Sequence, residues 1–261
     1  MKVSVITVVY NNRDTIADAI ESVCIQRGVD VELIVVDGAS TDGTRDVLAC
    51  NASKIAVLVS EPDRGIYDAL NKGIGLATGE VVGFLHSDDL LADDYAIARV
   101  VAQFADASVD AVYGDLVYVR KDDPSRIVRT WKAGAVTPAG LACGWMPPHP
   151  TFYARRSVYE RLGKFDTSFR IAADYDCMLR FLKAGIRVAY IPHLQVRMRV
   201  GGASNKSLVN VIKKSSEDFR ALRKNNVSPF VALVCKNLRK IPQFFNRVKA
   251  TDSDALQRAK N

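Results

Sequence analysis

The chain has 261 residues, of which 48% are hydrophobic and 25% are charged, a composition that is ordinary for one folded domain with or without an appendage. Its five cysteines are scattered without a Cys-x-x-Cys pair, which argues against a disulfide framework or a zinc knuckle and favours a reducing cytoplasm. The net charge of +7 is unevenly distributed along the chain. Residues 197–261 carry fifteen Lys or Arg against four Asp or Glu, while residues 1–196 are mildly acidic. This distribution argues against a nucleic-acid enzyme with a basic cleft.

Strand-like and helix-like runs alternate through the first third of the chain. The apolar segment at 3–10 predicts a buried first strand that is too short for a signal peptide. No run reaches the roughly 18 apolar residues that a membrane-spanning helix needs. Further strands are expected at 31–36, 55–60 and 81–85. Helices are expected at 16–23, in a short segment that follows the turn at 37–43 and ends near residue 50, and at 66–77. Such βα units predict an open, mostly parallel α/β sheet with right-handed crossovers and flanking helices.

Polar residues gather where the predicted strands end. Tyr10 follows the first strand, Asp37 follows the second, and Asp88 and Asp89 follow the fourth. In open α/β sheets, ligands bind outside these carboxyl ends. Two adjacent carboxylates repel each other unless a cation or a hydrogen-bonding ligand lies between them, and oxygen-rich sites of this kind hold Mg²⁺ or Mn²⁺. The alternative for the acidic pair is a turn or a helix N-cap.

The first strand is not followed by a glycine-rich phosphate loop, so neither a dinucleotide-binding fold nor a P-loop is expected. Three segments instead closely resemble the family 2 inverting glycosyltransferases, which have the nucleotide-sugar-binding GT-A fold. They are residues 3–11, residues 35–44 (Val-Val-Asp-Gly-Ala-Ser-Thr-Asp-Gly-Thr) and residues 84–89 (Phe-Leu-His-Ser-Asp-Asp). The resemblance covers roughly residues 1–205, and residues 61–74 look most like members that assemble bacterial polysaccharides.

This resemblance implies a donor site in the first half of the chain. Tyr10 would flank the base, Asp37 would accept a hydrogen bond from the uracil N–H, and Asp88 would contact the ribose. Asp89 would ligate Mn²⁺ or Mg²⁺ on the diphosphate, where the ion offsets the charge of the departing nucleoside diphosphate. Ser87 stands where the usual Asp-x-Asp pattern has its first carboxylate. The other implied donor contacts are Val8, Asp63, Asp68 and Arg199.

Residues 165–180 resemble the acceptor-side signature of the family, a Phe-Asp followed by an Asp that opens a helix. The match implies that Asp174 is the catalytic base, because displacement at the anomeric carbon needs a carboxylate to take the proton of the acceptor hydroxyl. The alternative is that Asp174 only caps the helix. Many members have Glu before the base, where this chain has Ala173, and Asp176 could replace part of that function.

A proline-rich loop at 145–151 resembles the segment that lies under the acceptor in this family. Trp145 is expected to stack on an acceptor sugar ring, and His149 is expected to line the cleft, with a structural role as the alternative for His149. Arg197 and Arg199 resemble part of a mobile loop that closes over the diphosphate. For His193, a structural role is expected rather than metal ligation.

Residues 206–261 predict a basic, amphipathic helical tail, interrupted at Pro242. Its apolar residues at helical spacing are Val234, Leu238, Ile241, Phe245 and Val248. One interpretation is a helix that covers the core. The other, favoured by the segregation of charge, is an interfacial helix that brings the protein to a lipid-linked acceptor on an anionic membrane surface.

We therefore expect a GT-A domain at 1–205, with a nucleotide-sugar-binding half at 1–115 and an acceptor half at 116–205, followed by the tail. The expected activity is metal-dependent, inverting transfer of a sugar from a UDP-sugar to a growing, lipid-linked bacterial glycan at the cytoplasmic membrane face, with no nucleic-acid partner. A sugar-nucleotide pyrophosphorylase is one alternative, but it should carry a glycine-rich loop after the first strand. A non-catalytic nucleotide-sugar- or glycan-binding partner in an assembly complex is the other, and Asp89 and Asp174 argue against it.

Overall fold

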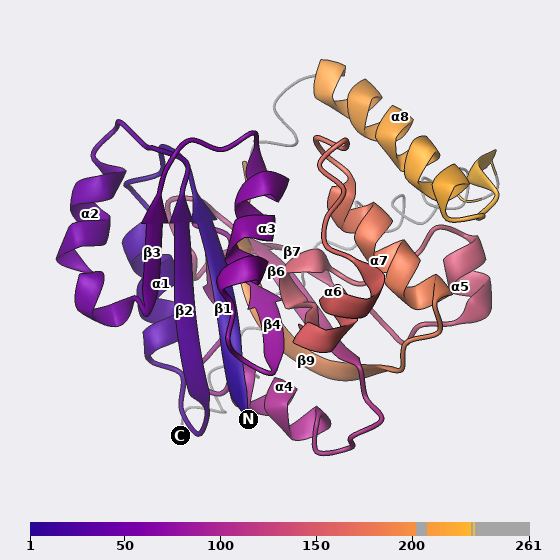
Figure 1. The fold of residues 1–261 in the computed structure, drawn as a ribbon, viewed down its shortest axis with the longest axis horizontal. Coiled ribbons are helices and arrows are strands. Elements are labelled where there is room, and N and C mark those ends of the chain that lie inside the picture. Colours follow the sequence, from indigo (N-terminus) through magenta and orange to yellow (C-terminus); the bar gives the residue numbers. More distant parts are fainter. Residues whose placement is uncertain (202–207, 231, 233–261) are drawn as a thin grey trace.

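The computed structural model describes residues 1–201, 208–230 and 232, which form helical layers on both faces of one mixed sheet (Figure 1). The sheet has nine strands in the order β3-β2-β1-β4-β8-β6-β9-β5, with β7 paired to β6. The strands are β1 (Lys2–Val9), β2 (Asp30–Asp37), β3 (Val57–Ser60), β4 (Val81–Phe84), β5 (Asp89–Leu91), β6 (Ala111–Val119), β7 (Ile127–Trp131), β8 (Tyr153–Arg155) and β9 (Val188–Arg199).

Helices cover the sheet from two sides, and the predicted α/β architecture is confirmed. One face carries α1 (Ile16–Cys24), α2 (Thr44–Cys50) and α4 (Ala96–Gln103), and the other carries α3 (Ile66–Leu76), α6 (Arg156–Leu162) and α7 (Ala173–Lys183). The remaining helical elements are α5 (Pro138–Ala142), α8 (Leu208–Lys224) and the short 3₁₀ turns η1 (Ala52–Lys54) and η2 (His149–Thr151).

The parallel part of the sheet brings the predicted donor residues to one edge. β1 pairs in parallel with β2 and with β4, and β2 pairs in parallel with β3, so these strands end side by side. Asp37 is the last residue of β2 and Tyr10 directly follows β1. After β4 the chain turns, with the N–H of Asp89 donating to the carbonyl of His86 at 3.0 Å. Asp89 does not simply close β4, because it also begins β5, where it lies opposite Met198 of β9.

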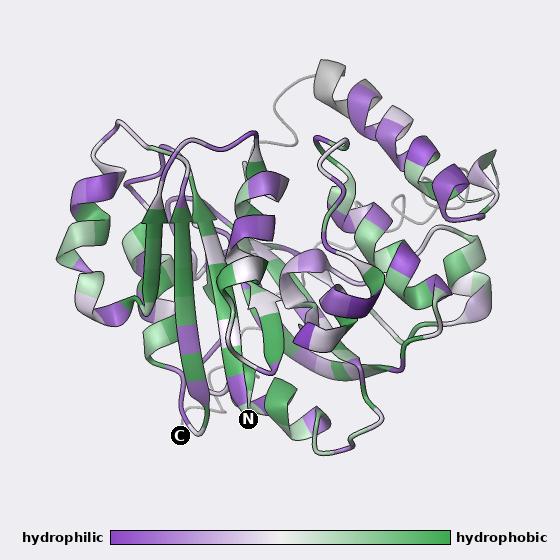
Figure 2. Ribbon diagram, in the orientation of Figure 1, coloured by the Kyte–Doolittle hydropathy of each residue, from purple (hydrophilic) through white to green (hydrophobic). Residues whose placement is uncertain are grey.

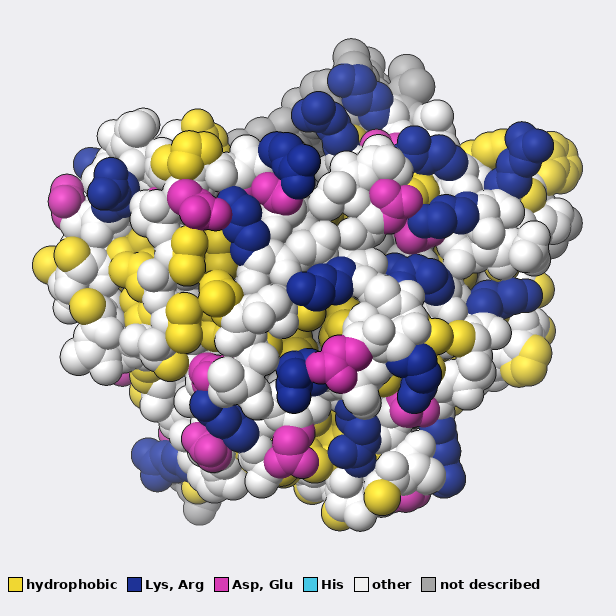
Figure 3. Space-filling view, in the orientation of Figure 1, with side chains coloured by type: hydrophobic (Ala, Val, Ile, Leu, Met, Phe, Trp, Pro, Cys, Tyr) yellow, Lys and Arg dark blue, Asp and Glu magenta, His cyan; other side chains and the backbone are white. Residues whose placement is uncertain are grey.

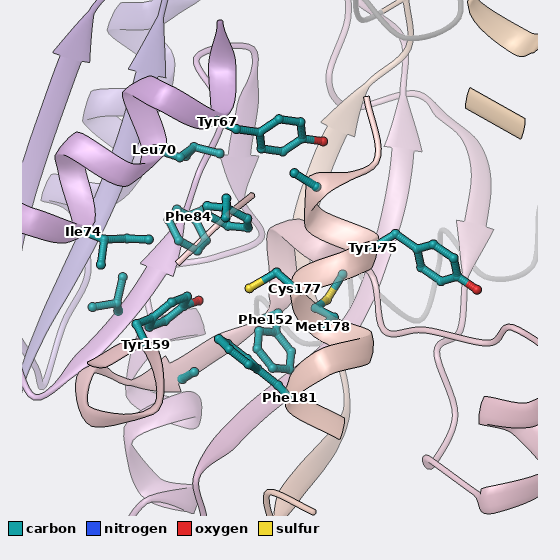
Figure 4. Close-up of a cluster of buried hydrophobic side chains, with 14 of the residues drawn as sticks. Tyr67, Leu70, Ile74, Phe84, Phe152, Tyr159, Tyr175, Cys177, Met178 and Phe181 are labelled. Carbon is teal, nitrogen blue, oxygen red and sulfur yellow. The ribbon is translucent and has the colours of Figure 1, made fainter. Parts of the chain in front are cut away.

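Two apolar layers explain why the first strands are hydrophobic along their whole length (Figure 2). Side chains on a strand alternate between faces, so Ile6 and Val8 enter one core while Val5 and Val9 enter the other. The first core contains the inward faces of α3, α6 and α7, with Tyr67, Phe84 and Phe181 among its aromatic rings (Figure 4). Parallel strands that are buried on both faces read as continuous apolar runs, which is the pattern in β1 and β2.

A buried carboxylate stabilises the opposite, amino-terminal end of the parallel strands. Glu32 of β2 accepts hydrogen bonds from Lys2 Nζ at 2.7 Å, Ser4 Oγ at 2.6 Å and Thr78 Oγ1 at 2.6 Å. The backbone N–H of Thr78 adds a fourth bond at 2.9 Å. Although burial acts to raise it, these hydrogen bonds lower the pKa of Glu32 to about 2. This cluster ties β1, β2 and the end of α3 together, far from the polar edge.

The first part of the predicted tail packs on the acceptor half. Ala221 and Leu222 of α8 are fully buried in the core that contains α7. Lys224 Nζ donates to Asp176 at 3.1 Å, which adds a polar contact between the two helices. Lys and Arg side chains gather over the outer face of α8 (Figure 3). Within the described residues, no helix has both the length and the apolar character to cross a bilayer. The apolar stripe predicted at 234–248 lies outside the described residues.

Candidate active site

Tyr10, Asp37 and Asp63 converge on the turn after β2. A Cβ on Gly38 would lie 2.5 Å from Asp63 Oδ2 and 3.3 Å from Tyr10 Cδ2, so only glycine lets these side chains approach the backbone this closely. The Tyr10 side chain is 66% exposed, which leaves its ring available to a ligand. Val8 lies two residues before Tyr10 and is buried near the end of β1. The structure thus brings together four of the residues that the sequence assigned to the donor.

The Asp37 carboxylate is buried and already holds the turns around it. It accepts hydrogen bonds from the N–H of Ser40 at 3.2 Å, from Ser60 Oγ at 2.6 Å and from the Ser40 hydroxyl. A carboxylate has about four lone-pair positions, so one further N–H can be accommodated. Ser40 also accepts from the N–H of Asn11, whose φ of 48° turns the chain sharply away from Tyr10. The two strand-end loops are therefore cross-linked.

Asp89 combines complete burial with an unsatisfied oxygen. Its Oδ1 accepts from the N–H of Arg199 at 3.3 Å, whereas Oδ2 has no hydrogen-bond partner among the described residues. Burial, and next the charge of Asp88, raise the pKa of Asp89 well above its usual range. A buried carboxylate oxygen without a donor is stabilised by a cation, so the site fits the predicted Mn²⁺ or Mg²⁺.

The protein would supply few of the ligands for such an ion. Among residues 1–201, 208–230 and 232, no group of three or more His, Cys, Asp or Glu side chains is placed to hold a metal. His193 is exposed, and its Nδ1 lies 3.2 Å from the carbonyl oxygen of Leu194. The fit therefore depends on Asp89 acting together with oxygen atoms of a bound ligand, as Mg²⁺ commonly does with phosphates.

Arg199 fixes the strand end that carries the acidic pair. Its buried guanidinium donates to the carbonyl oxygen of Asp88 at 3.1 Å and to Asp18 Oδ2, on α1, at 2.6 Å. Ser87 is held in the same way from the loop after β1, since its carbonyl accepts from Thr15 Oγ1 at 2.8 Å. The predicted contact of Arg199 with the donor stays a prediction, and in the structure its charge is directed to Asp18.

Asp174 lies in the first turn of α7 and is half-buried. The hydroxyl of Tyr67, on α3, is 3.1 Å from Asp174 Oδ1 and 2.7 Å from the carbonyl oxygen of Ile171. Burial raises the pKa of Tyr67, and the carboxylates of Asp174 and Glu217 raise it further, so the phenol stays protonated and acts as a donor. Figure 4 shows Tyr67 pointing from α3 toward the loop that leads into α7. Sequence reasoning assigned no role to Tyr67.

Two histidine rings lie close to each other, and the charge of Asp174 acts on both. His149 is buried against Phe84, with ring centroids 5.3 Å apart, and its centroid is 5.8 Å from that of His86. Burial lowers the pKa of His149 to about 4, although the charge of Asp174 opposes the shift. Burial also lowers the pKa of His86, against the charges of Asp88 and Asp174. Both imidazoles are therefore neutral at pH 7, and His86 lies within the electrostatic reach of both carboxylates.

Trp145, Asp68 and Asp176 make contacts with neighbouring parts of the chain. Trp145 is half-buried, donates through Nε1 to the carbonyl of Ala133 at 3.0 Å, and packs edge-on against Tyr113. Asp68 accepts from Arg64 Nη2 at 3.1 Å at the start of α3. The suggestion that Asp176 substitutes for the missing Glu near the base is not supported. Its buried carboxylate faces α8, where Lys224 and Asn225 occupy both oxygens.

Comparisons with known proteins identify the family to which the chain belongs. The model of the family described as Glycosyl transferase family 2 matches residues 4–173, which ends one residue before Asp174. A PGL/p-HBAD biosynthesis glycosyltransferase of Mycobacterium bovis is 30% identical over 208 residues, covering 77% of this chain and 78% of that protein.

Two solved structures are similar in fold. A mannosyltransferase from Pyrobaculum calidifontis, in complex with GDP-Man and Mn²⁺, superposes with a TM-score of 0.65 at 26% identity. The match covers 90% of this chain and 68% of the mannosyltransferase chain. S. aureus TarS 1-349 in complex with UDP-GlcNAc has a TM-score of 0.68 at 16% identity, and the match covers 97% of this chain and 78% of the TarS chain. The GT-A fold expected from the motifs is thereby confirmed, and because the family model matches well over half of the residues, the chain belongs to glycosyl transferase family 2.

Proposed function

We propose that the protein transfers a sugar from a UDP-sugar, with inversion at the anomeric carbon, to a hydroxyl of a growing, lipid-linked bacterial surface glycan. The observation that carries the proposal is the position of Asp174. Its Oδ1 is held 3.1 Å from the Tyr67 hydroxyl in the first turn of α7, and its charge, like that of the strand-end carboxylate Asp88, acts on the half-buried imidazole of His86. Direct displacement requires a base that is placed close to the bound donor.

In this reaction, Asp174 takes the proton of the acceptor hydroxyl as its oxygen attacks the anomeric carbon. The Tyr67 phenol donates to one carboxylate oxygen and leaves the other for the acceptor. Neutral His86 and His149 add no positive charge near the base. Asp89 would hold Mn²⁺ or Mg²⁺ together with the donor's phosphates, and such an ion supplies positive charge to the leaving nucleoside diphosphate.

The donor assignment rests on the turn around Gly38. The exposed ring of Tyr10 offers a face for a base to stack on, and the spare lone pair of Asp37 can accept an imide N–H. The similar structures contain UDP-GlcNAc in one case and GDP-Man in the other, so a panel with both bases decides the matter. The role in glycan assembly is supported by the biosynthetic glycosyltransferase to which the chain is similar.

Membrane association is part of the proposal. On and after α8, Phe219 is 45% exposed and Phe230 is 79% exposed, and the exposed cation Arg223 follows Phe219 by one helical turn. Basic side chains with protruding aromatic rings suit an anionic lipid surface, which is also where a lipid-linked acceptor would be found.

The proposal is tested by assaying transfer and donor hydrolysis with a panel of UDP- and GDP-sugars, Mn²⁺ and extracted glycolipid acceptors. We expect Asp174→Asn to abolish turnover while donor affinity, measured by calorimetry, stays within about twofold, because the amide keeps the shape but cannot take a proton. Asp122→Asn, at an exposed carboxylate before β7, is the matched control. Donor binding without hydrolysis or transfer in the wild type would instead support the non-catalytic alternative.

A further inference from the structure

Glu217, on α8, binds the backbone that leads into α7. Its Oε2 accepts hydrogen bonds from the N–H groups of Ile171 at 2.8 Å and Ala172 at 2.9 Å. The N–H of Arg170 lies 3.0 Å from Oε1 and 3.1 Å from Oε2. One carboxylate thus satisfies three successive backbone donors from a helix that is 45 residues away in the sequence.

These donors have no local partner to replace Glu217. Ala172 is the N-cap residue of α7 and has no side-chain oxygen, and the helix start has no side-chain cap bond. In a capping box, the side chain of the third helical residue would accept from the N–H of Ala172, but that residue is Tyr175, whose hydroxyl donates to the carbonyl of Gly144 instead. Hydrogen bonds from backbone N–H groups to a charged acceptor are stronger than those between neutral groups. The carboxylate from α8 therefore determines where this stretch of backbone lies.

The clamped backbone is the one that positions Asp174. Ile171 is held on both sides, because its N–H donates to Glu217 while its carbonyl accepts from the Tyr67 hydroxyl at 2.7 Å. Asp174 follows three residues later and shares the same Tyr67 hydroxyl. A displacement of Ile171 would therefore move the predicted base relative to α3.

Other α8 side chains hold the outer part of the same loop. Arg220 Nη2 donates to the carbonyl of Ser168 at 2.9 Å, and its guanidinium lies 3.8 Å from the ring centroid of Phe169. Lys224 Nζ donates to Asp166 at 2.8 Å. Glu217 is thus the innermost contact in a row along α8, and it is the one that reaches the residues directly before α7.

We propose that Glu217 is a positioning residue for the transfer reaction, holding residues 170–172 so that Asp174 is placed against the acceptor hydroxyl. This role rests on the proposed function, in which Asp174 is the base. It requires no contact between Glu217 and either substrate. Misplacing a reacting group by about 1 Å can cost on the order of 100-fold in rate, so the expected effect is on turnover and not on donor binding.

The test compares Glu217→Ala with Glu217→Gln and with Glu160→Ala, which removes an exposed carboxylate on α6. We expect Glu217→Ala to lower kcat by roughly 10- to 100-fold, with the donor Kd within about twofold of wild type. Glu217→Gln should restore kcat to within about fivefold, because the amide oxygen can still accept from Ile171 and Ala172. Glu160→Ala should leave kcat unchanged.

Hydrogen exchange at the amides of 170–174, measured on the ligand-free proteins, gives a readout that does not depend on activity. We expect protection in the wild type and faster exchange in Glu217→Ala, with thermal unfolding confirming that the variant is folded at the assay temperature. Faster exchange with unchanged kcat would overturn the positioning role. A kcat loss matched by Glu160→Ala, or explained by the unfolded fraction, would also overturn it. A wild type that is inactive with all donors would refute the proposed function itself, and Glu217 would then be a structural clamp only.

Discussion

Tyr67→Phe removes a single hydroxyl from the centre of the candidate site. That hydroxyl is 2.7 Å from the carbonyl of Ile171 and 3.1 Å from Asp174 Oδ1, and the Tyr67 side chain is buried. Because a phenol has one hydrogen, the variant loses the equivalent of one strong hydrogen bond shared between two acceptors. It also leaves the part-buried carbonyl of Ile171 without this donor.

The size of the effect follows from these contacts. A net loss of about 1–2 kcal/mol in unfolding free energy is expected for a buried hydrogen bond of this kind, more than for a neutral surface pair. If the same interaction orients Asp174 in the transition state, a similar loss there lowers kcat by roughly tenfold, since 1.36 kcal/mol corresponds to a factor of ten. The donor Kd should not change.

Tyr153→Phe is the matched control. Tyr153 on β8 is as deeply buried as Tyr67, but its hydroxyl has no hydrogen-bond partner among the described residues. Removing it should leave stability unchanged or slightly raised, with kcat unchanged. Urea unfolding and steady-state kinetics on both variants provide the comparison. Wild-type kcat in Tyr67→Phe, or equal losses in the two variants, would refute the orienting role of the hydroxyl.

Three further predictions concern other parts of the molecule. Asp89→Asn should abolish the thermal stabilisation by Mn²⁺ with a nucleotide sugar yet leave the ligand-free protein at least as stable, because it neutralises a buried, half-satisfied carboxylate. The pKa of Glu32 is lowered from 4.5 to about 2, so its contribution to stability is present above pH 4.5 and is lost as the pH falls toward 2. At most about 3 kcal/mol of unfolding free energy should disappear over that range in the wild type, and much less in Glu32→Gln. Urea unfolding at each pH measures the difference. In liposome co-sedimentation, the intact protein should bind anionic but not neutral vesicles, and less so at high salt. The charge reversal Arg223→Glu should weaken this binding without changing donor affinity, whereas equal binding to both lipids would contradict an electrostatic contact.

The parallel half of the fold could be predicted because its determinants are local. The apolar runs of β1 and β2, the helical spacing in α1 and α3 and the turn residues between them all lie within a few residues of one another. The position of Asp37 at a strand end follows directly from this pattern. Asp89 shows the limit of local reasoning, because it opens β5 by pairing with β9, about 110 residues later.

The parts of the site that sequence reasoning missed all depend on distant contacts. Tyr67 reads as an apolar residue at the start of a helix, and its bond to Asp174 spans 107 positions. The contact of Arg199 with a diphosphate stays a prediction, and the partner that the sequence did not reveal is Asp18, 181 positions earlier, which accepts from its guanidinium. Neither partner could be identified without knowing which elements the sheet places side by side.

The basic C-terminal segment shows why a net charge is a poor guide to what a helix does. The sum for residues 197–261 is strongly positive, yet an acid, Glu217, makes the contact with the predicted catalytic loop. On α8, Glu217 and the buried Leu222 face the domain, while Phe219 and Arg223 are exposed. The two interpretations of the tail, a cover for the core and a lipid-binding surface, are therefore compatible on opposite faces of one helix. Truncation before α8 would remove both at once, because it exposes the core and frees the loop before Asp174. Charge reversal on the outer face of the intact chain separates them, since it leaves every contact of Glu217 in place.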